Sequence, residues 1–478
     1  MIGSIKRICC IGAGYVGGPT MAVIADKCKN IQVNVVDINE DRINQWNNKS
    51  LDDLPIFEPG LSEIVGRCRN KNLFFSNDID QNISQADLIF ISVNTPIKDK
   101  GLGAGLAIDL KWVESSARRI SKYATGHTIV VEKSTLPVKT ARTIKEILDV
   151  HNLNSSKENF SRKSFSVLSN PEFLAEGTAI KDLEDPDRVL IGGDDQKAIE
   201  ALSEVYLKWV KSEKIITTNL WSSELSKLTA NAFLAQRISS TNSISAICEA
   251  TGANIDEVSL AISMDRRIGS KFLKPGPGFG GSCFKKDILN LIYICKYYGL
   301  IEVANYWEQV LKINDWQQRR ITNEIVRKLY GTLHGKIISI FGFAFKANTN
   351  DTRESPAIKI CRELLEEGAF LKIYDPKVKK SQIELDLNKK EIKNEKSDLE
   401  DGGWIFKKNY LDASIDSDAI VILTEWEEFN NLDWEEISSC MRKPSWVFDT
   451  RSIIKLDKLK NSDLKFWGVG YGSNDREF

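Results

Sequence analysis

A glycine motif close to the amino terminus limits the chain to few folds. The apolar residues 5–11 lead into Gly12, Gly14 and Gly17, and another apolar run follows at 22–25. This order predicts a buried strand, a tight turn and a helix. A further apolar run at 33–36 ends at Asp37. Together they indicate the first half of a doubly wound α/β domain.

Each glycine of the motif has its own physical role. Gly12 permits the tight turn, Gly14 lets the backbone approach a pyrophosphate, and Gly17 lets the helix pack closely on the strand. Tyr15 and Val16 complete the loop, and the phosphate would lie at the helix amino terminus, where unpaired N–H groups point. The motif therefore predicts a dinucleotide site.

Asp37 indicates which dinucleotide is bound. It lies about 20 residues beyond the motif, where a carboxylate accepts hydrogen bonds from the adenosine ribose and repels a 2′-phosphate. This favours NAD over NADP. Arg42 makes this preference for NAD less strict, because an arginine nearby can accommodate the 2′-phosphate of NADP.

The rest of the chain repeats the pattern after a helical interval. Strand-like runs at 88–93, 128–131 and 189–192 alternate with helical segments, which predicts a parallel sheet covered on both faces. Helical spacing dominates from 221 to about 330, and a second strand, turn, helix and strand follow, ending at Asp375. We expect an α/β chain of two doubly wound Rossmann-like domains joined by an all-helical central section, with bounds 1–215, 216–330 and 331–478.

The composition argues against some classes of partner and indicates the cellular compartment. The chain has 478 residues, with 65 Lys and Arg against 66 Asp and Glu, which is too balanced for a main partner that is nucleic acid or an anionic membrane. No run approaches the ~20 apolar residues of a membrane helix, and no signal-peptide pattern is present. The nine cysteines form no C-x-x-C pair. We expect a cytoplasmic chain with reduced cysteines and no metal.

Two segments interrupt the periodic pattern. Residues 152–164 and 377–403 contain charges of both signs and no periodic pattern of apolar residues. They therefore have too little apolar surface to become ordered by burying it. We expect both to be surface loops without a functional role.

A loop rich in proline and glycine at 275–281 precedes Ser282 and Cys283. Ser282 is a credible N-cap, which would place Cys283 in the first helical turn, where the helix dipole and two following lysines favour a thiolate. The alternative is a small buried residue, the usual fate of a free cysteine. Beside a dinucleotide, a thiolate that adds to an aldehyde allows oxidation to a thioester and release by water.

Two further pairs of residues offer polar chemistry at a spacing of four. Glu172 and Glu176 share one face if their segment is helical, and either suits a base or a group that binds through water. Lys227 and Asn231 share the same spacing on a predicted helix and could steady an oxyanion. The alternative for both pairs is an exposed helix face.

These stretches, taken together, resemble the UDP-glucose/GDP-mannose dehydrogenase family, and within it the UDP-glucose 6-dehydrogenases. The resemblance runs from the first strand to about residue 451. It rests on the glycine motif at 12–20, Ser-Val-Asn-Thr-Pro at 92–96, Glu-Lys-Ser-Thr at 132–135, Asn-Pro-Glu-Phe-Leu-Ala-Glu-Gly at 170–177, Phe-Gly-Gly-Ser-Cys-Phe at 279–284 and Asp-Thr-Arg-Glu-Ser at 351–355. It implies a two-step, NAD-dependent oxidation of the C6 hydroxyl of UDP-glucose to UDP-glucuronate, through a cysteine thiohemiacetal and thioester.

The resemblance also implies roles for single residues. Cys283 is the nucleophile, Lys227 and Asn231 stabilise the oxyanion and hold substrate, Glu172 is the acid/base, and Thr135 and Asp287 position water. The implied cofactor residues are those of the glycine motif with Asp37, Arg42, Val93, Asn94, Thr95, Pro96, Ser134, Thr135, Glu176 and Arg353. The implied substrate residues are Glu172, Phe173, Leu174, Lys227, Asn231, Arg267, Phe272, Lys274, Phe279, Gly280, Phe345, Lys346 and Arg451.

Charge and assembly fit this resemblance. Lys274, Lys346 and Arg451 supply cations for the pyrophosphate of UDP. Arg267 matches a family residue that reaches substrate across a subunit boundary, which implies a homo-oligomer, either a dimer or a hexamer of dimers. The prolines at 275 and 277, and the run 347–349, depart from the family pattern without touching the reacting groups.

Three alternatives remain open at this level. The first is a sister enzyme acting on another nucleotide sugar, such as UDP-N-acetylmannosamine or GDP-mannose. The second is a one-step dehydrogenase of the 3-hydroxyacid or 6-phosphogluconate type, which needs no thiolate. The third is a protein that binds nucleotide sugar without turnover. A panel of nucleotide sugars tests the first alternative, and the amount of NADH formed from UDP-glucose tests the second and the third.

Overall fold

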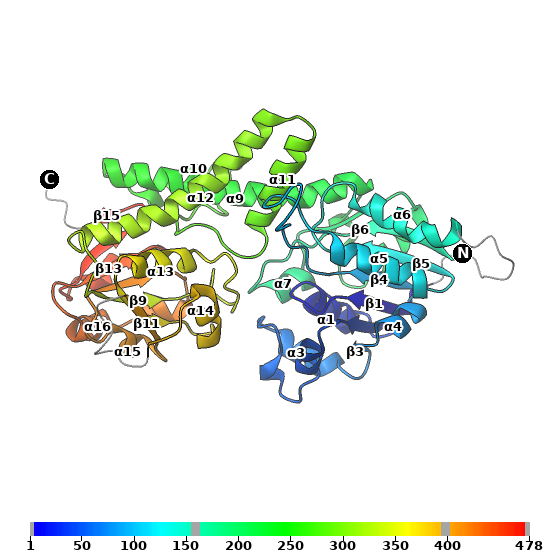
Figure 1. Ribbon diagram of the computed structural model, residues 1–478, viewed down its shortest axis with the longest axis horizontal. Coiled ribbons are helices and arrows are strands. Elements are labelled where there is room, and N and C mark those ends of the chain that lie inside the picture. The colour runs from blue at the N-terminus through cyan, green and yellow to red at the C-terminus, as the bar shows by residue number, and fades with distance from the viewer. Residues whose placement is uncertain (1–3, 154–162, 393–401, 474–478) are drawn as a thin grey trace. The chain divides into compact units, whose positions relative to one another are not determined.

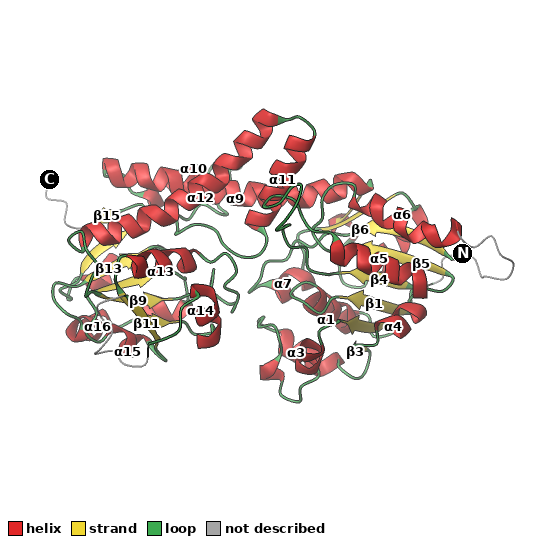
Figure 2. Cartoon of the chain, viewed as in Figure 1, coloured by secondary structure: helices red, strands yellow, loops and turns green. Residues whose placement is uncertain are grey.

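The structure is a computed structural model, which describes residues 4–153, 163–392 and 402–473. The chain divides into two compact units. The first comprises Met1–Ala230 and Leu289–Gly299, and the second comprises Asn231–Ile288 and Leu300–Phe478. In each unit a sheet is covered by helices, as the yellow strands and red helices of Figure 2 show.

The first unit is built on a sheet with strand order β3-β2-β1-β4-β5-β6-β7-β8. Described strands pair in parallel except β6 with β7, which run antiparallel, so the expected parallel sheet is correct but for this pair. The order reverses between β1 and β4, the place where doubly wound sheets bind ligands at their carboxyl edge. The strands are β1 (Arg7–Ile11), β2 (Gln32–Val36), β3 (Leu73–Ser76), β4 (Leu88–Ile91), β5 (His127–Glu132), β6 (Ser164–Ser169), β7 (Val189–Gly193) and β8 (Ile215–Thr218).

Helices cover both faces of this sheet, which is why its strands are apolar throughout. In β1, Ile8 and Cys10 enter one core while Cys9 and Ile11 enter the other, because successive side chains of a strand point to opposite faces. The first core is closed by α1 (Gly17–Lys27), α2 (Glu40–Trp46), α3 (Leu61–Cys68), α7 (Ala179–Glu184) and α8 (Gln196–Tyr206). The second is closed by α4 (Ile79–Gln85), α5 (Lys111–Tyr123) and α6 (Thr140–Leu153) (Figure 1).

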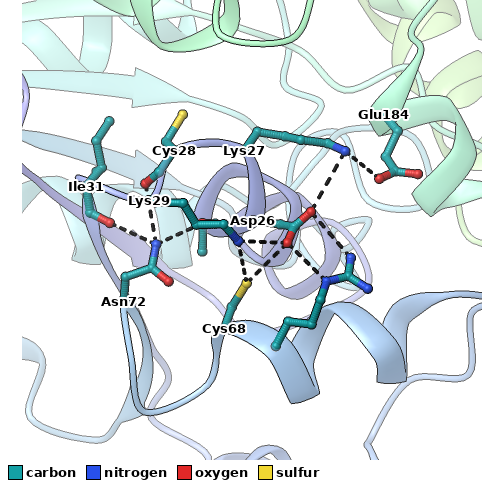
Figure 3. A network of polar contacts seen from close by, with 10 residues as sticks. Asp26, Lys27, Cys28, Lys29, Ile31, Cys68, Asn72 and Glu184 are labelled. Atoms are coloured by element: carbon teal, nitrogen blue, oxygen red, sulfur yellow. Dashed lines mark hydrogen bonds and ion pairs between the residues drawn. The ribbon is translucent and has the colours of Figure 1, made fainter.

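Ion pairs tie the carboxyl end of α1 to its neighbours (Figure 3). The carboxylate of Asp26 accepts hydrogen bonds from Lys29 Nζ at 2.9 Å and from Arg67 Nε of α3 at 3.2 Å. Lys27 Nζ bonds Glu184 of α7 at 2.7 Å. Asp26 is therefore the anion that holds α3 against the end of α1.

The second unit contains a sheet with strand order β11-β10-β9-β12-β13-β14-β15. Its described pairs are parallel except β14 with β15. The strands are β9 (Ile337–Phe341), β10 (Phe370–Tyr374), β11 (Gly403–Phe406), β12 (Ala419–Ile422), β13 (Trp446–Asp449), β14 (Lys465–Gly468) and β15 (Gly472–Ser473). The helices that accompany them are α13 (Pro356–Glu366), α14 (Lys380–Leu387), α15 (Tyr410–Ser414) and α16 (Trp434–Cys440).

This second sheet repeats the turn of the first. Gly342 follows β9 with φ +90°, as Gly12 follows β1 with φ +111°. Asp375 follows β10 as Asp37 follows β2, and its carboxylate is bonded within the protein. Its donors are the N–H groups of Phe343 (2.7 Å), Ala344 (3.0 Å), Lys377 (2.8 Å) and Val378 (2.8 Å) and the indole of Trp426 (3.2 Å).

The predicted helical section consists of four long or medium helices in the described chain. They are α9 (Leu220–Thr251), α10 (Ile255–Ser263), α11 (Phe284–Tyr297) and α12 (Ile301–Lys328). By the ranges of the two units, α9 begins in the first and ends in the second. None of the helices described here is long and apolar enough to cross a membrane.

The predicted loop 377–403 is wrong in part, because α14 lies within it. Ile383 and Leu387 of α14 are buried, and their spacing of four places them on one face. Residues 393–401 of this segment, and 154–162 of the other predicted loop, lie outside the described residues. The domain bounds at 215 and 330 stay a prediction.

Candidate active site

The glycine loop of the first unit has the geometry that a pyrophosphate needs. A Cβ on Gly12 would lie 2.2 Å from Ser92 O, and one on Gly17 would lie 2.0 Å from Gly12 O, so neither position tolerates a side chain. A Cβ on Gly14 would meet nothing within 4 Å. The amino terminus of α1 has no side-chain cap at Val16. An approachable backbone next to uncapped N–H groups fits a bound phosphate.

Asp37 directly follows β2 and is fixed by the same loop. Its Oδ2 accepts the N–H of Ala13 at 2.9 Å, and its Oδ1 accepts that of Asn39 at 2.9 Å. Arg42 Nη1 lies 3.2 Å from Oδ2. The arginine thus pairs with the carboxylate that was expected to select the ribose.

The ends of β4 and β5 meet beside this loop. Ser134 Oγ donates to Val93 O at 2.7 Å, so the two predicted cofactor segments are joined by a hydrogen bond. Thr95 is buried, Asn94 is exposed, and Pro96 and Thr135 are half-buried.

Residues 170–178 form a loop, so Glu172 and Glu176 do not share a helical face. Glu58 Oε1 accepts the N–H of Gly177 at 2.6 Å, and Asp182 Oδ2 accepts the N–H of residue 175 at 2.9 Å. These carboxylates from other segments take the backbone donors that a helix would use internally. Glu176 is half-buried.

The carboxylate of Glu172 is held from two sides. Its Oε1 accepts the N–H groups of Phe173 at 2.8 Å and Leu174 at 3.1 Å. Lys133 Nζ forms an ion pair with Oε2 at 2.9 Å. Burial acts to raise the pKa of Glu172, but Lys133 and the backbone donors outweigh it, and the pKa is lowered. Sequence reasoning missed Lys133, although it lies within the quoted motif at 132–135.

Phe173 lies on the same loop, and two cations from other segments contact its aromatic ring. Arg188 Cζ lies 3.9 Å from the ring centroid and Lys227 Nζ lies 5.2 Å from it. Two predicted residues, Phe173 and Lys227, are thus brought together, and Arg188 is a further cation that the sequence did not indicate. Cation–π contacts orient both the ring and the charged groups.

Cys283 is the exposed cysteine of the chain. All nine cysteines lie in the described residues; seven are buried, Cys440 is half-buried and Cys283 is exposed. The structure starts α11 at Phe284, so Cys283 precedes the first turn instead of lying in it. Its carbonyl accepts the N–H of Asp287 at 2.9 Å, which is the role of an N-cap residue. The reading of Cys283 as a buried small residue is therefore wrong.

The lysines that follow Cys283 pair with carboxylates. Lys285 Nζ lies 2.8 Å from Glu354 Oε2, and Lys286 Nζ lies 3.6 Å from Asp287 Oδ1. The sulfur itself contacts the hydroxyl of Ser282 at 3.5 Å. The two lysines that were expected to act on the sulfur therefore each have a carboxylate partner.

Asn231 and Asp287, two predicted catalytic residues of the second unit, are in direct contact. Asn231 Nδ2 donates to Asp287 Oδ2 at 2.5 Å, and both side chains are buried. The other oxygen, Asp287 Oδ1, lies 3.6 Å from Lys286 Nζ but is buried without a hydrogen-bond partner in the described part of the chain. A buried carboxylate oxygen of this kind suits a water molecule or a substrate hydroxyl as its donor.

The loop before Cys283 is held by amide side chains. Asn242 Oδ1 accepts the N–H of Gly276 at 2.8 Å, and Asn314 Oδ1 accepts that of Phe279 at 2.7 Å. Gln317 Nε2 donates to the carbonyl of Gly276 at 2.8 Å. The predicted loop residues therefore have a fixed backbone.

Several predicted substrate residues meet along this loop. A Cβ on Gly280 would lie 2.9 Å from Phe345 Cβ, and one on Gly276 would lie 3.7 Å from Arg451 Nη1. Arg451 Nη2 donates to Phe345 O at 2.9 Å, while its Nη1 lies 3.1 Å from Glu425 Oε2. Lys346 Nζ lies 5.5 Å from the Phe345 ring centroid.

Further predicted residues are exposed or pair with a residue close to them in sequence. Arg267 bonds its neighbour Asp265, and its side chain is 88% exposed. Phe272 and Lys274 are exposed. Arg353 bonds Asp351, although its carbonyl accepts the N–H of the loop residue 281 at 2.8 Å.

Comparison with known families accounts for this geometry. Residues 6–210 match the NAD binding domain, 221–316 the central domain and 339–456 the UDP binding domain of one family. The chain belongs to the UDP-glucose/GDP-mannose dehydrogenase family. Together the three matches cover most of the chain in the order of the family's domains.

Named relatives of this dehydrogenase family are similar over nearly the whole chain. The UDP-glucose 6-dehydrogenase of Bos taurus is 56% identical over 461 residues, covering 96% of this chain and 90% of the relative. UDP-glucose 6-dehydrogenase 1 of Glycine max is 54% identical over 475 residues, covering 97% of each. A solved UDP-glucose dehydrogenase from Pyrobaculum islandicum has a TM-score of 0.80 at 28% identity, covering 98% of each chain.

The predicted family, fold class and cofactor are thereby confirmed. The chain is an oxidoreductase with the family's NAD binding domain, and the glycine loop fits that cofactor on its own geometry. It is an α/β protein with two Rossmann-like sheets and helices between them in sequence.

Proposed function

We propose that this dehydrogenase oxidises the C6 hydroxyl of UDP-glucose to UDP-glucuronate in two NAD-dependent steps, with Cys283 as the nucleophile. The UDP binding domain and the identity to UDP-glucose 6-dehydrogenases support the substrate. The observation that carries the mechanism is the exposure of Cys283 at the start of α11. An accessible thiol at a helix amino terminus is a place where thiolates form and react.

Bound NAD supplies the hydride acceptor at each step. In the first step, C6 loses a hydride and its hydroxyl loses a proton, which gives an aldehyde. The Cys283 thiolate then adds to the aldehyde carbon, forming a C–S bond and a thiohemiacetal. Loss of a second hydride from C6 and of the hydroxyl proton of the thiohemiacetal gives a thioester. Water attacks the thioester, the C–S bond breaks, and the carboxylate and thiol are released.

The remaining residues of the proposal hold charge and protons. Glu172, as a carboxylate, is suited to accept a proton, and Lys227 is suited to stabilise the alkoxide or oxyanion. Asn231 fixes one oxygen of Asp287, which leaves the other to orient the attacking water. Residues of the glycine loop bind the cofactor pyrophosphate.

In the second unit, the uridine diphosphate is bound by the loop 274–280 and the residues packed on it. Lys346 and Arg451 supply cations for its phosphates, and the fixed backbone of Gly276 and Phe279 lowers the entropy lost on binding. Arg267 is proposed to reach substrate in a neighbouring subunit.

The yield of NADH from a limiting amount of UDP-glucose tests this function. We expect two NADH per sugar from the natural chain, measured by absorbance until the reaction stops. The Cys283→Ser variant should lose the second oxidation, because a serine hydroxyl is a far weaker nucleophile than a thiolate. Mass spectrometry should then find no UDP-glucuronate, and an aldehyde or covalent species at most.

The control is Cys440→Ser, which alters a half-buried thiol outside the proposed site and should keep two NADH per sugar. A yield of one NADH from the natural chain would favour the one-step alternative. No NADH at all would favour a binding protein. Faster turnover of UDP-N-acetylmannosamine or GDP-mannose would favour a sister enzyme.

We also propose that the chain is a cytoplasmic homo-oligomer, formed in part by the central helices of the second unit. Four large apolar side chains on or next to α9 and α10 are exposed: Phe233 (56%), Ile247 (56%), Leu260 (66%) and Met264 (77%). A gathering of exposed apolar residues on one pair of helices is typical of an interaction surface.

A further inference from the structure

A buried lysine contacts the carboxylate of Glu172. Lys133 directly follows β5 and is 4% exposed. Its Nζ lies 2.9 Å from Glu172 Oε2, 3.1 Å from Asn170 Oδ1 and 3.3 Å from the hydroxyl of Tyr206. An ammonium group has three donors, and each has a partner here.

The partners of Lys133 are themselves fixed. The Tyr206 hydroxyl donates to Asn170 Oδ1 at 2.7 Å, and Asn170 Nδ2 donates to Leu190 O of β7 at 2.8 Å. The N–H of Asn170 bonds the carbonyl of Glu132 at 2.9 Å. The ammonium group is therefore held by β5, β6, β7 and α8 at once and has little freedom to move.

We propose that Lys133 is a positioning residue that, with Tyr206 and Asn170, holds Glu172 as an ionised carboxylate in one orientation for the proposed oxidation. The inference rests on the proposed function, in which Glu172 accepts a proton. A lysine loses much solvation energy on burial, and its ion pair with Glu172 at 2.9 Å offsets part of that cost.

The charges around Glu172 agree with this role. Burial acts to lower the pKa of Lys133, but Glu172 and Tyr206 outweigh it and the pKa is raised, so the ammonium stays charged. Lys227 on α9 also lowers the pKa of Glu172, by a smaller amount. Cys10 of β1 interacts with Lys133, and burial raises the pKa of that thiol, which leaves it neutral. Lys133 is thus the main cation that keeps Glu172 ionised.

The test is the pH dependence of kcat/KM for UDP-glucose in Lys133→Met. Removing the cation should raise the pKa of Glu172, so the acidic limb of the profile should move to higher pH. A move of one pH unit corresponds to about tenfold lower activity at a pH on that limb. Lys27→Met is the matched control, because it breaks the 2.7 Å pair with Glu184 and should leave the limb unmoved.

Infrared titration gives a readout that does not depend on turnover. The carboxyl band of Glu172 is assigned by its loss in Glu172→Gln. The pH at which this band titrates should be higher in Lys133→Met. Thermal unfolding and NAD binding check that the variant is folded. If it does not fold, Tyr206→Phe serves instead, since loss of one anchor should move the same limb and band by less in the same direction.

The outcomes separate the inference from the proposed function. A folded Lys133→Met or Tyr206→Phe with the natural limb and band would overturn the inference, because a merely structural lysine would leave both in place. Full turnover by Glu172→Gln would instead remove the proposed role of Glu172, whatever the band in Lys133→Met does.

Discussion

At the scale of single residues, burial raises the pKa of two glutamates, Glu132 and Glu224. Glu132 ends β5, and Glu224 lies in the first turns of α9. Burial, and then repulsion by Glu224, raise the pKa of Glu132 well above its usual range, and burial also raises that of Glu224. Glu224 accepts the N–H groups of Lys139 at 2.6 Å and Ala141 at 2.8 Å, so it is the better placed of the two to carry the charge.

The Glu132→Gln variant should gain stability only at higher pH. A raised pKa in the folded state means that ionisation favours the unfolded chain as pH rises above the ordinary value near 4.5. Glutamine can still donate to Glu224 but does not ionise. We expect a thermal midpoint higher by about 2–4 °C near pH 8 and little changed near pH 4, measured by calorimetry. Glu146→Gln, on the surface, should show no such trend, and an equal difference at both pH values would contradict the raised pKa of Glu132.

Residues whose contacts are local were predictable in position. Gly12, Gly17 and Asp37 follow from spacing along one strand and helix, since their partners are fixed by the same turn. Lys133 and Arg188 were missed because their partners come from distant parts of the sequence. Lys133 and Tyr206 are 73 residues apart, and no local pattern signals such a contact.

At the scale of elements, the carboxyl end of α1 depends on one anion. Asp26 bonds Lys29 and Arg67, and its side chain is 12% exposed while theirs are 62% and 53% exposed. Burial acts to raise the pKa of Asp26, but the hydrogen bonds from Arg67 and Lys29 outweigh it and lower the pKa to about 2.

The Asp26→Asn variant should be destabilised at neutral pH and not in acid. A lowered pKa contributes stability above the ordinary value of 3.8, and this is lost as pH falls through about 2. After allowing for solvent screening we expect a loss of about 1 kcal/mol, or about 2–4 °C in the thermal midpoint. Asp185→Asn, which breaks an exposed pair with Lys214, should leave the midpoint in place. A loss of stability that persists at the lowest pH would show that the substitution acts through packing and not through charge.

Strands were easier to predict than helix ends and loops. The apolar runs of β1, β4 and β5 identify them because both sheet faces are buried. α14 was missed because only Ile383 and Leu387 mark its buried face among many charges. The start of α11 was predicted one residue too early. Ser282 has the side chain of an N-cap, but the first helical hydrogen bond goes to the carbonyl of Cys283.

At the scale of the whole molecule, two Rossmann-like sheets were predictable because the pattern of glycine turn and acidic strand end occurs twice. The antiparallel pairs β6 with β7 and β14 with β15 were not, because strand direction depends on connections between elements and leaves no mark in apolar runs.

The exposed apolar side chains of α9 and α10 give a prediction for assembly. Replacing Ile247 and Leu260 together by Asp should shift the chain to smaller species in analytical ultracentrifugation, because charge is costly in an apolar interface. Leu385→Asp is the control, because that residue is 73% exposed on α14 and outside these helices. An unchanged sedimentation profile in the double variant would exclude these helices from the interface.

The saturated carboxylate of Asp375 has a consequence for how one chain serves two nucleotides. Both sheets have a glycine turn and an aspartate after the next strand, so the nucleotide that binds to one unit could in principle bind to the other. Two carboxylate oxygens offer about four lone-pair sites, and five donors of the protein already address those of Asp375. An adenosine ribose would find little acceptor capacity left on this carboxylate, so we expect NAD to bind to the first unit and not to the second.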